Sequence, residues 1–426
     1  MSRSWAGAEM VDTLTPRQRS ERMALIRSKG TKLDRCDETR RMRGMRNLFT
    51  FYEFFAGGGM ARAGLGPQWE CLFANDFDSK KAATYIVNWG GAALKVDDVA
   101  RTSVTELPGT AHLAWASFPC QDLSLAGYGT GLNGARSGSF WPFWRLMRAL
   151  AREERAPRTI VLENVYGAVT SHQGKDLAAI CEALSKEGYR YAPLVIDAQH
   201  FLPQSRPRLF ILAFSHDAVP PLSLVRQGPE APWHPDSFGL AYNRLTDAAR
   251  AAWLWLYPPV PPGRRIRLAD LIEDEPTSVK WHSAAETQRL LSMMTPANLE
   301  KVKQAKKARQ RMIGALYKRT RVGKDGIKRQ RAEVRFDDTA GCLRTPAGGS
   351  SRQIILVVEG NRIRSRLLSP REAARLMGLP EHYVLPDRYN DAYHLAGDGV
   401  AVPVVSWIAR HVIEPSLKAR AVRKAA

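Results

Sequence analysis

From Leu48 onward, short apolar runs alternate with helix-like segments. Runs of strand length occur in "LFTFYEFF", "WECLFAND", "AHLAWASFPC", "PRTIVLENV" and "RLFILAF". Helix-like segments separate several of them, among them "MARAGLG", "DSKKAATYIVNW" and "SFWPFWRLMRALAREE". Strands that alternate with helices at these spacings predict an α/β fold, in which a mostly parallel sheet carries helices on both faces.

Changes in this pattern divide the chain into four segments. Residues 1–47 are polar and basic, and residues 48–213 carry the strand–helix alternation. Residues 214–360 are rich in proline and turn signals and predict a smaller, irregular domain. In residues 361–426 the helical pattern returns with "SPREAARLMGLP", which begins like a capping box. We expect this last segment to rejoin the α/β domain and to end in a basic tail.

Composition excludes several classes of protein. The hydrophobic content of 44% excludes wholesale disorder, and five cysteines among 426 residues do not form a secreted disulfide framework. The N-terminus lacks an apolar signal-peptide core, and no stretch approaches ~18 uninterrupted apolar residues. These features predict a soluble protein of a reducing compartment, with no membrane partner.

The net charge of +21 is unevenly distributed. Residues 300–335 carry 14 basic and 3 acidic side chains, whereas residues 48–213 carry 16 and 15. This distribution favours a polyanionic partner that is held beside a nearly neutral reaction centre. A solvated basic helix without a partner is the alternative.

A glycine-rich motif, "FYEFFAGGG", joins the first predicted strand to a helix. Glycines at this point allow the backbone to approach a ligand closely, although a simple tight turn is the alternative. Asp76 lies 19 residues beyond Gly57, where an acidic side chain can accept hydrogen bonds from a ribose, and Asp98 follows the next segment. The three strand ends predict a site for a nucleoside-type cofactor. A Walker-type G-K-[ST] motif is absent, so nucleotide hydrolysis has no support.

Four residues at other strand ends carry reactive or charged groups. Cys120 in "SFPCQDLS" is placed as a nucleophile, with a buried free thiol as the alternative. Glu163 closes the strand "VLENV", where a carboxyl group can engage the ring nitrogens of a heterocycle. Arg206 and Arg208 stand two residues apart in "QSRPR", so both side chains can reach one site. The remaining cysteines show no paired spacing, and we expect no metal.

In this order, the motifs resemble those of the cytosine-C5 DNA methyltransferases. Further blocks that look like those of the family are "AND" (74–76), "DDV" (97–99), "GARSGSF" (134–140), "RLLSPREAARLMGLP" (366–380) and "GDGVAVPVV" (397–405). The resemblance extends from Leu48 to Ile413. It implies a catalytic and cofactor-binding domain over 48–213, and a target recognition domain over 214–360.

The resemblance implies S-adenosylmethionine as cofactor, without a metal. In this resemblance, Asp76 would bind the ribose and Phe77 would stack on the adenine. Asp98 and Val99 would lie at the edge of the adenine. The full set of implied cofactor-binding residues is Phe55, Ala56, Gly57, Gly58, Gly59, Asp76, Phe77, Asp98, Val99, Pro119, Ser139, Asp398 and Val400.

The resemblance also implies the reaction and its substrate. Cys120 would attack C6 of a cytosine flipped out of double-stranded DNA, Glu163 would bind N3 and the exocyclic amine, and Arg206 and Arg208 would orient the base. The cationic segment would contact phosphates, and "TPAGGSSRQ" would reach base edges, with an ordinary turn as the alternative. The implied DNA-binding residues are Gln121, Ser124, Arg136, Lys318, Arg319, Arg321, Arg344, Ser350, Ser351, Arg352 and Gln353.

Two segments depart from the family pattern. Asp398 stands where the family usually has Asn in "GN-x-V", which places a carboxylate near a cationic sulfonium. Residues 12–32 resemble the opening segment of very-short-patch (Vsr) mismatch endonucleases, without a counterpart of their catalytic portion. We interpret residues 1–47 as a DNA-contacting or vestigial arm.

The main hypothesis is therefore a cytoplasmic, nucleoid-associated bacterial modification enzyme. We expect it to be a monomer with a cognate restriction endonuclease as functional partner. An RNA cytosine-C5 methyltransferase is one alternative, and a non-catalytic DNA-binding or repair-linked protein is another.

Overall fold

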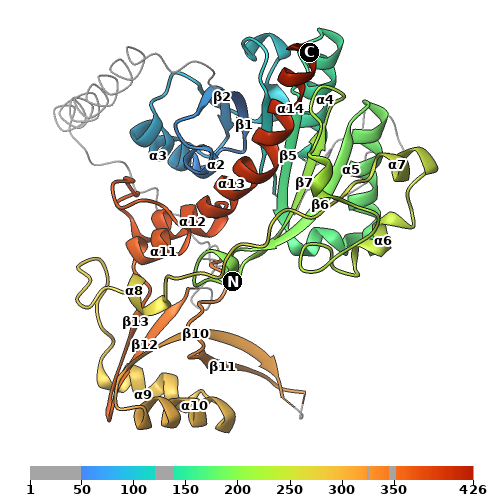
Figure 1. Ribbon diagram of the computed structural model, residues 1–426. Coiled ribbons are helices and arrows are strands. Elements are labelled where there is room, and N and C mark those ends of the chain that lie inside the picture. Colours follow the sequence, from blue (N-terminus) through green and yellow to red (C-terminus); the bar gives the residue numbers. More distant parts are fainter. Residues whose placement is uncertain (1–48, 120–138, 324–325, 345–351, 426) are drawn as a thin grey trace, which may run out of the picture. The chain divides into compact units, whose positions relative to one another are not determined.

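Seven strands form the large sheet of the protein in the order β3-β2-β1-β4-β5-β7-β6 (Figure 1). The computed structural model describes residues 49–119, 139–323, 326–344 and 352–425. The strands are β1 (Phe49–Phe54), β2 (Trp69–Asp76), β3 (Leu94–Val96), β4 (Leu113–Ala116), β5 (Thr159–Val165), β6 (Arg190–Asp197) and β7 (Pro207–Phe214). The pairings from β3 through β5 are parallel, and β7 runs antiparallel to both β5 and β6. The predicted mostly parallel sheet is confirmed.

Helices cover both faces of this sheet because alternate residues of each strand point to opposite sides. In β1, Phe51 faces one hydrophobic core, while Tyr52 and Phe54 face the other. The first core is completed by α2 (Met60–Leu65), α11 (Pro370–Leu376), α12 (Tyr389–Asp398) and α13 (Val402–Ile408). The second core is completed by α4 (Phe140–Arg152) and α5 (Lys175–Lys186).

The C-terminal segment returns to the large sheet and becomes part of its first core. The predicted capping box at the start of α11 is present, because Ser369 Oγ accepts a hydrogen bond from Glu372 N and Glu372 Oε2 accepts one from Ser369 N. Farther on, Ser406 Oγ donates to Gly64 O at 2.6 Å, which ties α13 to α2. The chain then continues through α14 (Glu414–Ala425).

A second, four-stranded antiparallel sheet follows the order β11-β10-β12-β13. Its strands are β10 (Arg311–Val322), β11 (Lys328–Arg335), β12 (Ile354–Glu359) and β13 (Arg362–Leu367). Leu316 and Val334 on one face pack in a core of their own with residues of α9 (Ala284–Ser292) and α10 (Pro296–Lys307). Ala315 and Ile355 on the other face belong to the first core of the large sheet. The basic segment is thus a helix followed by two strands, and the sheet extends past residue 360.

The remaining α-helices and short strands lie between these elements. They are α3 (Ser79–Trp89), β8 (Val225–Arg226), α6 (Phe238–Tyr242), α7 (Asp247–Ala252), β9 (Trp255–Leu256) and α8 (Leu268–Leu271). Within the described ranges, we find no helix that is long and apolar enough to span a membrane.

Candidate active site

The glycine-rich loop between β1 and α2 presents one open position. Gly57 has a φ of 56°, in the left-handed region that favours glycine, and its N–H donates to Asp76 Oδ2 at 2.7 Å. Among the described residues, a Cβ built on Gly57 would meet only Lys81 Cδ, at 4.0 Å. A ligand can therefore approach the backbone here.

The other two glycines of the motif are required by packing. A Cβ on Gly58 would lie 2.3 Å from Tyr383 Oη, and one on Gly59 would lie 2.3 Å from Trp89 Nε1. The same two side chains donate hydrogen bonds to Gly58 O, at 2.6 Å from Tyr383 and 2.9 Å from Trp89. Tyr383 and Trp89 thus hold the glycine-rich loop in place. The sequence analysis identified neither of them.

Acidic and aromatic residues follow the ends of β2 and β3. Asp76 accepts hydrogen bonds from the N–H groups of Gly57 and Asp78. Burial raises the pKa of its carboxyl group, although these hydrogen bonds act to lower it. The next side chain, Phe77, is 71% exposed. Asp98 caps a short helical turn by accepting from Ala100 N. The loop after β1 therefore lies beside the Asp76 carboxylate, and the exposed ring of Phe77 directly follows Asp76 in the chain.

Asp398, the residue that departs from the family pattern, forms an ion pair with Lys81 and contacts His394. It ends α12, and its Oδ2 lies 2.6 Å from Lys81 Nζ and 3.0 Å from His394 Nε2. The next residue, Gly399, packs so closely on α2 that a Cβ there would lie 2.0 Å from Met60 Sδ. The "GDG" segment is thus fixed against the glycine-rich loop, and its carboxylate has a cationic partner.

The remaining predicted cofactor-binding residues differ in exposure. Val99 and Val400 are buried in the second and first core, respectively, and Pro119 is exposed. Ser139 precedes α4, and its buried Oγ has no hydrogen-bond partner among the described residues. An unsatisfied buried hydroxyl is costly unless a ligand or water binds it.

Glu163 and Arg208 meet at the edge formed by β5 and β7. Glu163 is only 6% exposed, and its Oε1 lies 3.4 Å from Arg208 Nε. The antiparallel register pairs Val165 with Arg208, which brings the two side chains together. Cys120, the expected nucleophile, lies outside the described residues.

Arg206 is a buried cross-link between three segments. It is 1% exposed and donates to the carbonyl oxygens of Gly397 and Gly399 at 2.7 Å and of Leu343 at 3.2 Å. Burial, with the positive charge of Arg208, lowers the pKa of its guanidinium to about 10. Its role in the structure is to join β7 to the "GDG" segment and to the segment before residue 345.

Both arginines also reach one thiol, that of Cys342. Its Sγ lies 3.4 Å from Arg206 Nη1 and 3.8 Å from Arg208 Nη2. Cys342 O accepts a hydrogen bond from Tyr317 Oη of β10 at 2.8 Å. Cys342 therefore connects the small sheet to the Glu163–Arg208 pair. The sequence analysis assigned this cysteine no role.

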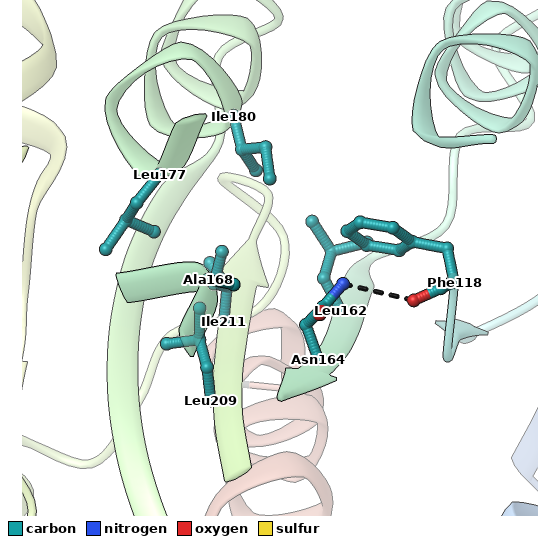
Figure 2. Close-up of a pocket in the computed structure, with 8 residues that line it drawn as sticks. All are labelled: Phe118, Leu162, Asn164, Ala168, Leu177, Ile180, Leu209 and Ile211. Carbon is teal, nitrogen blue, oxygen red and sulfur yellow. Dashed lines mark hydrogen bonds between the residues drawn. The ribbon is translucent and has the colours of Figure 1, made fainter. Parts of the chain in front are cut away.

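Asn164, next to Glu163, anchors the chain just before Cys120. Its Nδ2 donates to Phe118 O at 3.0 Å, and Figure 2 shows this bond between the end of β5 and the segment that follows β4. The small hollow beside it is lined otherwise by apolar side chains: Phe118, Leu162, Ala168, Leu177, Ile180, Leu209 and Ile211. Asn164 thus connects β5 to the segment after β4, and the sequence analysis did not identify it.

The expected DNA-binding residues lie in different parts of the structure, and several lie outside the described residues. Lys318, Arg319 and Arg321 lie on β10, and Arg344 is exposed. Arg352 donates to Asn390 Oδ1 at 2.6 Å. The rest of the set, Gln121, Ser124, Arg136, Ser350 and Ser351, lies outside the described residues.

Gln353 differs from the expectation of a base-reading side chain. It is fully buried, and its Nε2 donates to the carbonyl oxygens of Leu316 and Ile354. It directly precedes β12, so its amide joins β12 to β10 inside the small sheet. We do not include it in the proposed DNA surface.

Within the described part of the chain, no group of three or more His, Cys, Asp or Glu side chains is arranged to hold a metal ion. The acidic and thiol groups above are instead engaged by arginines, lysines and backbone N–H groups.

Comparison with known proteins identifies relatives along most of the chain. A family model described as C-5 cytosine-specific DNA methylase matches residues 49–414. The type II methyltransferase M.HpaII of Haemophilus parainfluenzae is 25% identical over 390 residues, which cover 87% of this chain and 90% of that protein. M.NlaX of Neisseria lactamica is 26% identical over 370 residues, which cover 86% and 96%. The crystal structure of S. pombe Dnmt2 shares the fold, with a TM-score of 0.51, 17% identity and coverage of 84% and 96%.

Proposed function

The chain belongs to the C-5 cytosine-specific DNA methylases, and from this membership we propose that it methylates C5 of cytosine in double-stranded DNA. The observation that carries the proposal is the family match over residues 49–414. Its curated relatives include type II methyltransferases, which supports a role as a bacterial modification enzyme.

The residues at the carboxyl ends of β1, β2 and β3 fit S-adenosylmethionine. Gly57 leaves room for the methionine end, the Asp76 carboxylate can accept from ribose hydroxyls, and the exposed ring of Phe77 can stack on adenine. Ser139 Oγ, which is buried and unsatisfied within the described chain, is a further group for the cofactor to bind. When bound, the cofactor supplies an electrophilic methyl group on a sulfonium.

The protein's part in the reaction is to make cytosine C5 nucleophilic. We propose that the Cys120 thiolate bonds to C6, which moves electron density to C5. Glu163 binds N3 and the exocyclic amine, and Arg208, at 3.4 Å from Glu163, stabilises the charge that develops on the base. After C5 has taken the methyl group, loss of the C5 proton and cleavage of the Sγ–C6 bond restore the aromatic ring. Arg206 supports the site by holding together the segments around Leu343, Gly397 and Gly399.

Methylation mapping tests the activity and the substrate together. DNA and tRNA from cells that express the chain should be sequenced by a method that reads 5-methylcytosine, with Cys120→Ala as the matched control. We expect a defined methylated DNA sequence that is lost in the variant. Equal methylation of tRNA, or methylation by Cys120→Ala, would contradict the proposal.

A fluorinated substrate tests the covalent step. Fluorine at C5 of the target cytosine prevents the loss of a proton from C5, so the Sγ–C6 bond persists. We expect mass spectrometry to find one methylated adduct on Cys120. An adduct on Cys342, which lies beside the same arginines, would require a different nucleophile.

Further properties belong to the proposal. We propose a monomer in the bacterial cytoplasm, associated with the nucleoid and accompanied by a cognate restriction endonuclease. The Vsr-like segment 12–32 lies outside the described residues, and we propose that it contacts DNA. Deletion of residues 1–47 should then weaken DNA binding and leave cofactor binding unchanged.

A further inference from the structure

Lys81 and Asp398 form a partly exposed ion pair next to the glycine at which we place the methionine end of the cofactor. Lys81 Nζ lies 2.6 Å from Asp398 Oδ2, and the two side chains are 20% and 36% exposed. The stem of Lys81 lies against Gly57, because a Cβ built there would be 4.0 Å from Lys81 Cδ. The charged groups of the pair can therefore reach a ligand that occupies the space above Gly57.

Both charges stand at helix ends that disfavour them. Lys81 lies in the first turn of α3, where the helix dipole disfavours a cation. Asp398 is the last residue of α12, where the helix dipole disfavours an anion. The ion pair offsets this cost in the folded chain. Two such placements in one pair indicate a role other than the stability of the helices.

The packing of α3 on the segment that contains α12 does not depend on this pair alone. The preceding lysine, Lys80, lies 3.0 Å from Asp391 Oδ1 through its Nζ. At the other end of α3, the Asn88 side chain donates to Val384 O at 2.9 Å and accepts from Val384 N at 2.8 Å. The two helices lie side by side (Figure 1). Both members of the pair can thus exchange partners while the helix backbones stay in place.

Each member of the pair also keeps hydrogen-bonding capacity for a ligand. An ammonium group has three N–H donors, and among the described residues Lys81 uses one of them, on Asp398. The contacts of Asp398 with Lys81 and His394 both use Oδ2. Its Oδ1 accepts no hydrogen bond from the part of the chain that the structure describes. A donor and an acceptor of opposite charge therefore stand next to each other.

The same glycine contacts the residue that we propose for the ribose. Gly57 N donates to Asp76 Oδ2 at 2.7 Å. Burial raises the pKa of Asp76, and the positive charge of Lys81 is among the interactions that oppose this rise. Lys81 is therefore close enough to Asp76 for one ligand molecule to contact both residues.

We propose that Lys81 and Asp398 bind the amino-acid end of S-adenosylmethionine, with its carboxylate on the Lys81 ammonium and its α-ammonium on the Asp398 carboxylate. This inference rests on the proposed function and adds Lys81 to the cofactor-binding residues. The amino-acid end carries one negative and one positive charge, so it matches the pair group by group and leaves the net charge of the site unchanged.

The test measures Kd by isothermal titration calorimetry on the full-length chain, with ligands that differ in one charged group. S-adenosylhomocysteine carries the amino-acid end without the sulfonium charge, and its decarboxylated and deaminated forms each lack one group of that end. For Lys81→Met we expect the Kd of S-adenosylhomocysteine to rise about tenfold, through the loss of one charge-assisted hydrogen bond. The Kd of the decarboxylated ligand should not rise, because that ligand has no group for Lys81 to bind.

Asp398→Asn is the reciprocal variant, because its amide keeps the shape of the side chain and loses the charge. S-adenosylhomocysteine should bind to it more weakly than to the wild type, whereas the deaminated ligand should bind at least as well. The matched control is Lys80→Met, which removes the neighbouring lysine of the same helical turn and should leave the Kd values of all these ligands unchanged. Circular dichroism and thermal melting check that every variant is folded.

Two results in Lys81→Met would overturn the inference. One is an equal loss of affinity for S-adenosylhomocysteine and for its decarboxylated form, and the other is an unchanged Kd for S-adenosylhomocysteine. A wild type that binds S-adenosylhomocysteine but methylates no duplex DNA would instead contradict the proposed function, since the titrations contain no DNA. A wild type that does not bind S-adenosylhomocysteine would overturn both.

Discussion

Lys81 on α3 and Asp398 at the end of α12 form an ion pair beside Gly57 of the glycine-rich loop. Their Nζ and Oδ2 atoms are 2.6 Å apart, and Lys81 Cδ would lie 4.0 Å from a Cβ on Gly57. The family usually carries an uncharged Asn in place of Asp398. In this chain Lys81 balances the carboxylate of Asp398.

Removal of Lys81 should change the preference between cofactor and product. S-adenosylmethionine carries a sulfonium charge that S-adenosylhomocysteine lacks. In Lys81→Met, the uncompensated Asp398 should favour the charged ligand by about threefold in the ratio of the two Kd values, since the pair is partly exposed. Calorimetric titrations of both ligands at pH 8 measure this ratio, and adding Asp398→Asn should restore it. An equal change in both affinities would contradict the electrostatic explanation.

The two donors to Gly58 O predict coupled effects. Tyr383→Phe or Trp89→Phe removes one hydrogen bond and should cost about 1 kcal/mol of unfolding free energy. The double variant leaves a buried carbonyl without either donor and should cost more than the sum of the single changes. Urea denaturation measures the stability, and the KM for S-adenosylmethionine should rise in parallel. Additive costs with an unchanged KM would show that the two bonds do not act on the loop together.

Glu53 predicts a specific dependence of stability on pH. Burial in β1 raises the pKa of its carboxyl group to about 8, although Oε1 accepts a hydrogen bond from Arg62 N. Between about pH 4.5 and pH 8, the unfolded chain has lost this proton and the folded chain retains it. Stability from this group is therefore present at low pH and is lost as pH rises, by about 1 kcal/mol per unit.

Glu53→Gln is the matched variant for this effect, because glutamine stays neutral throughout. Its free energy of unfolding should increase relative to that of the wild type from pH 5 to pH 8, because only the wild type loses stability as pH rises. Urea denaturation at four pH values over this range checks the trend. Parallel profiles for the two proteins would contradict a raised pKa for Glu53.

Asn164 should control the rate of the chemical step without contacting the base. Its bond to Phe118 O fixes the chain two residues before Cys120. Asn164→Ala should lower kcat at least tenfold with little change in the KM for S-adenosylmethionine. Asn164→Asp keeps the acceptor for Val165 N but loses the donor to Phe118 O, so it should match the alanine variant in adduct formation with the fluorinated duplex. A wild-type rate for Asn164→Asp would eliminate the positioning role.

The parts of the fold that sequence could predict are those fixed by local patterns. Strand-length apolar runs identify β1, β2, β4, β5 and β7, and Ser369 with Glu372 identifies the start of α11. The position of Asp76 follows from its place at the end of a strand next to the glycine loop. These features depend on side-chain alternation and on hydrogen bonds within a few residues.

Contacts between distant segments could not be predicted in this way. Tyr383 and Gly58 are 325 residues apart, and neither has a local pattern that indicates the other. Arg206 was expected at the base, yet its guanidinium is largely used on backbone carbonyls that only the folded chain brings near. Gln353 appeared to belong to a surface loop because its neighbours are small and polar, whereas its amide is enclosed by β10 and β12.

The packing of Gly58 has a consequence for the order in which the protein can mature on the ribosome. Its loop is among the first parts of the described chain to be synthesised, but Tyr383 and Leu395, which pack against it, are among the last. Trp69 likewise donates to Glu414, 345 residues later. A nascent chain that has made every proposed catalytic group through Arg208 therefore still lacks Tyr383 and Leu395, two of the side chains that pack against its glycine-rich loop. The enzyme should gain the ability to bind cofactor only at the end of translation, so that incomplete chains stay inactive on the host genome.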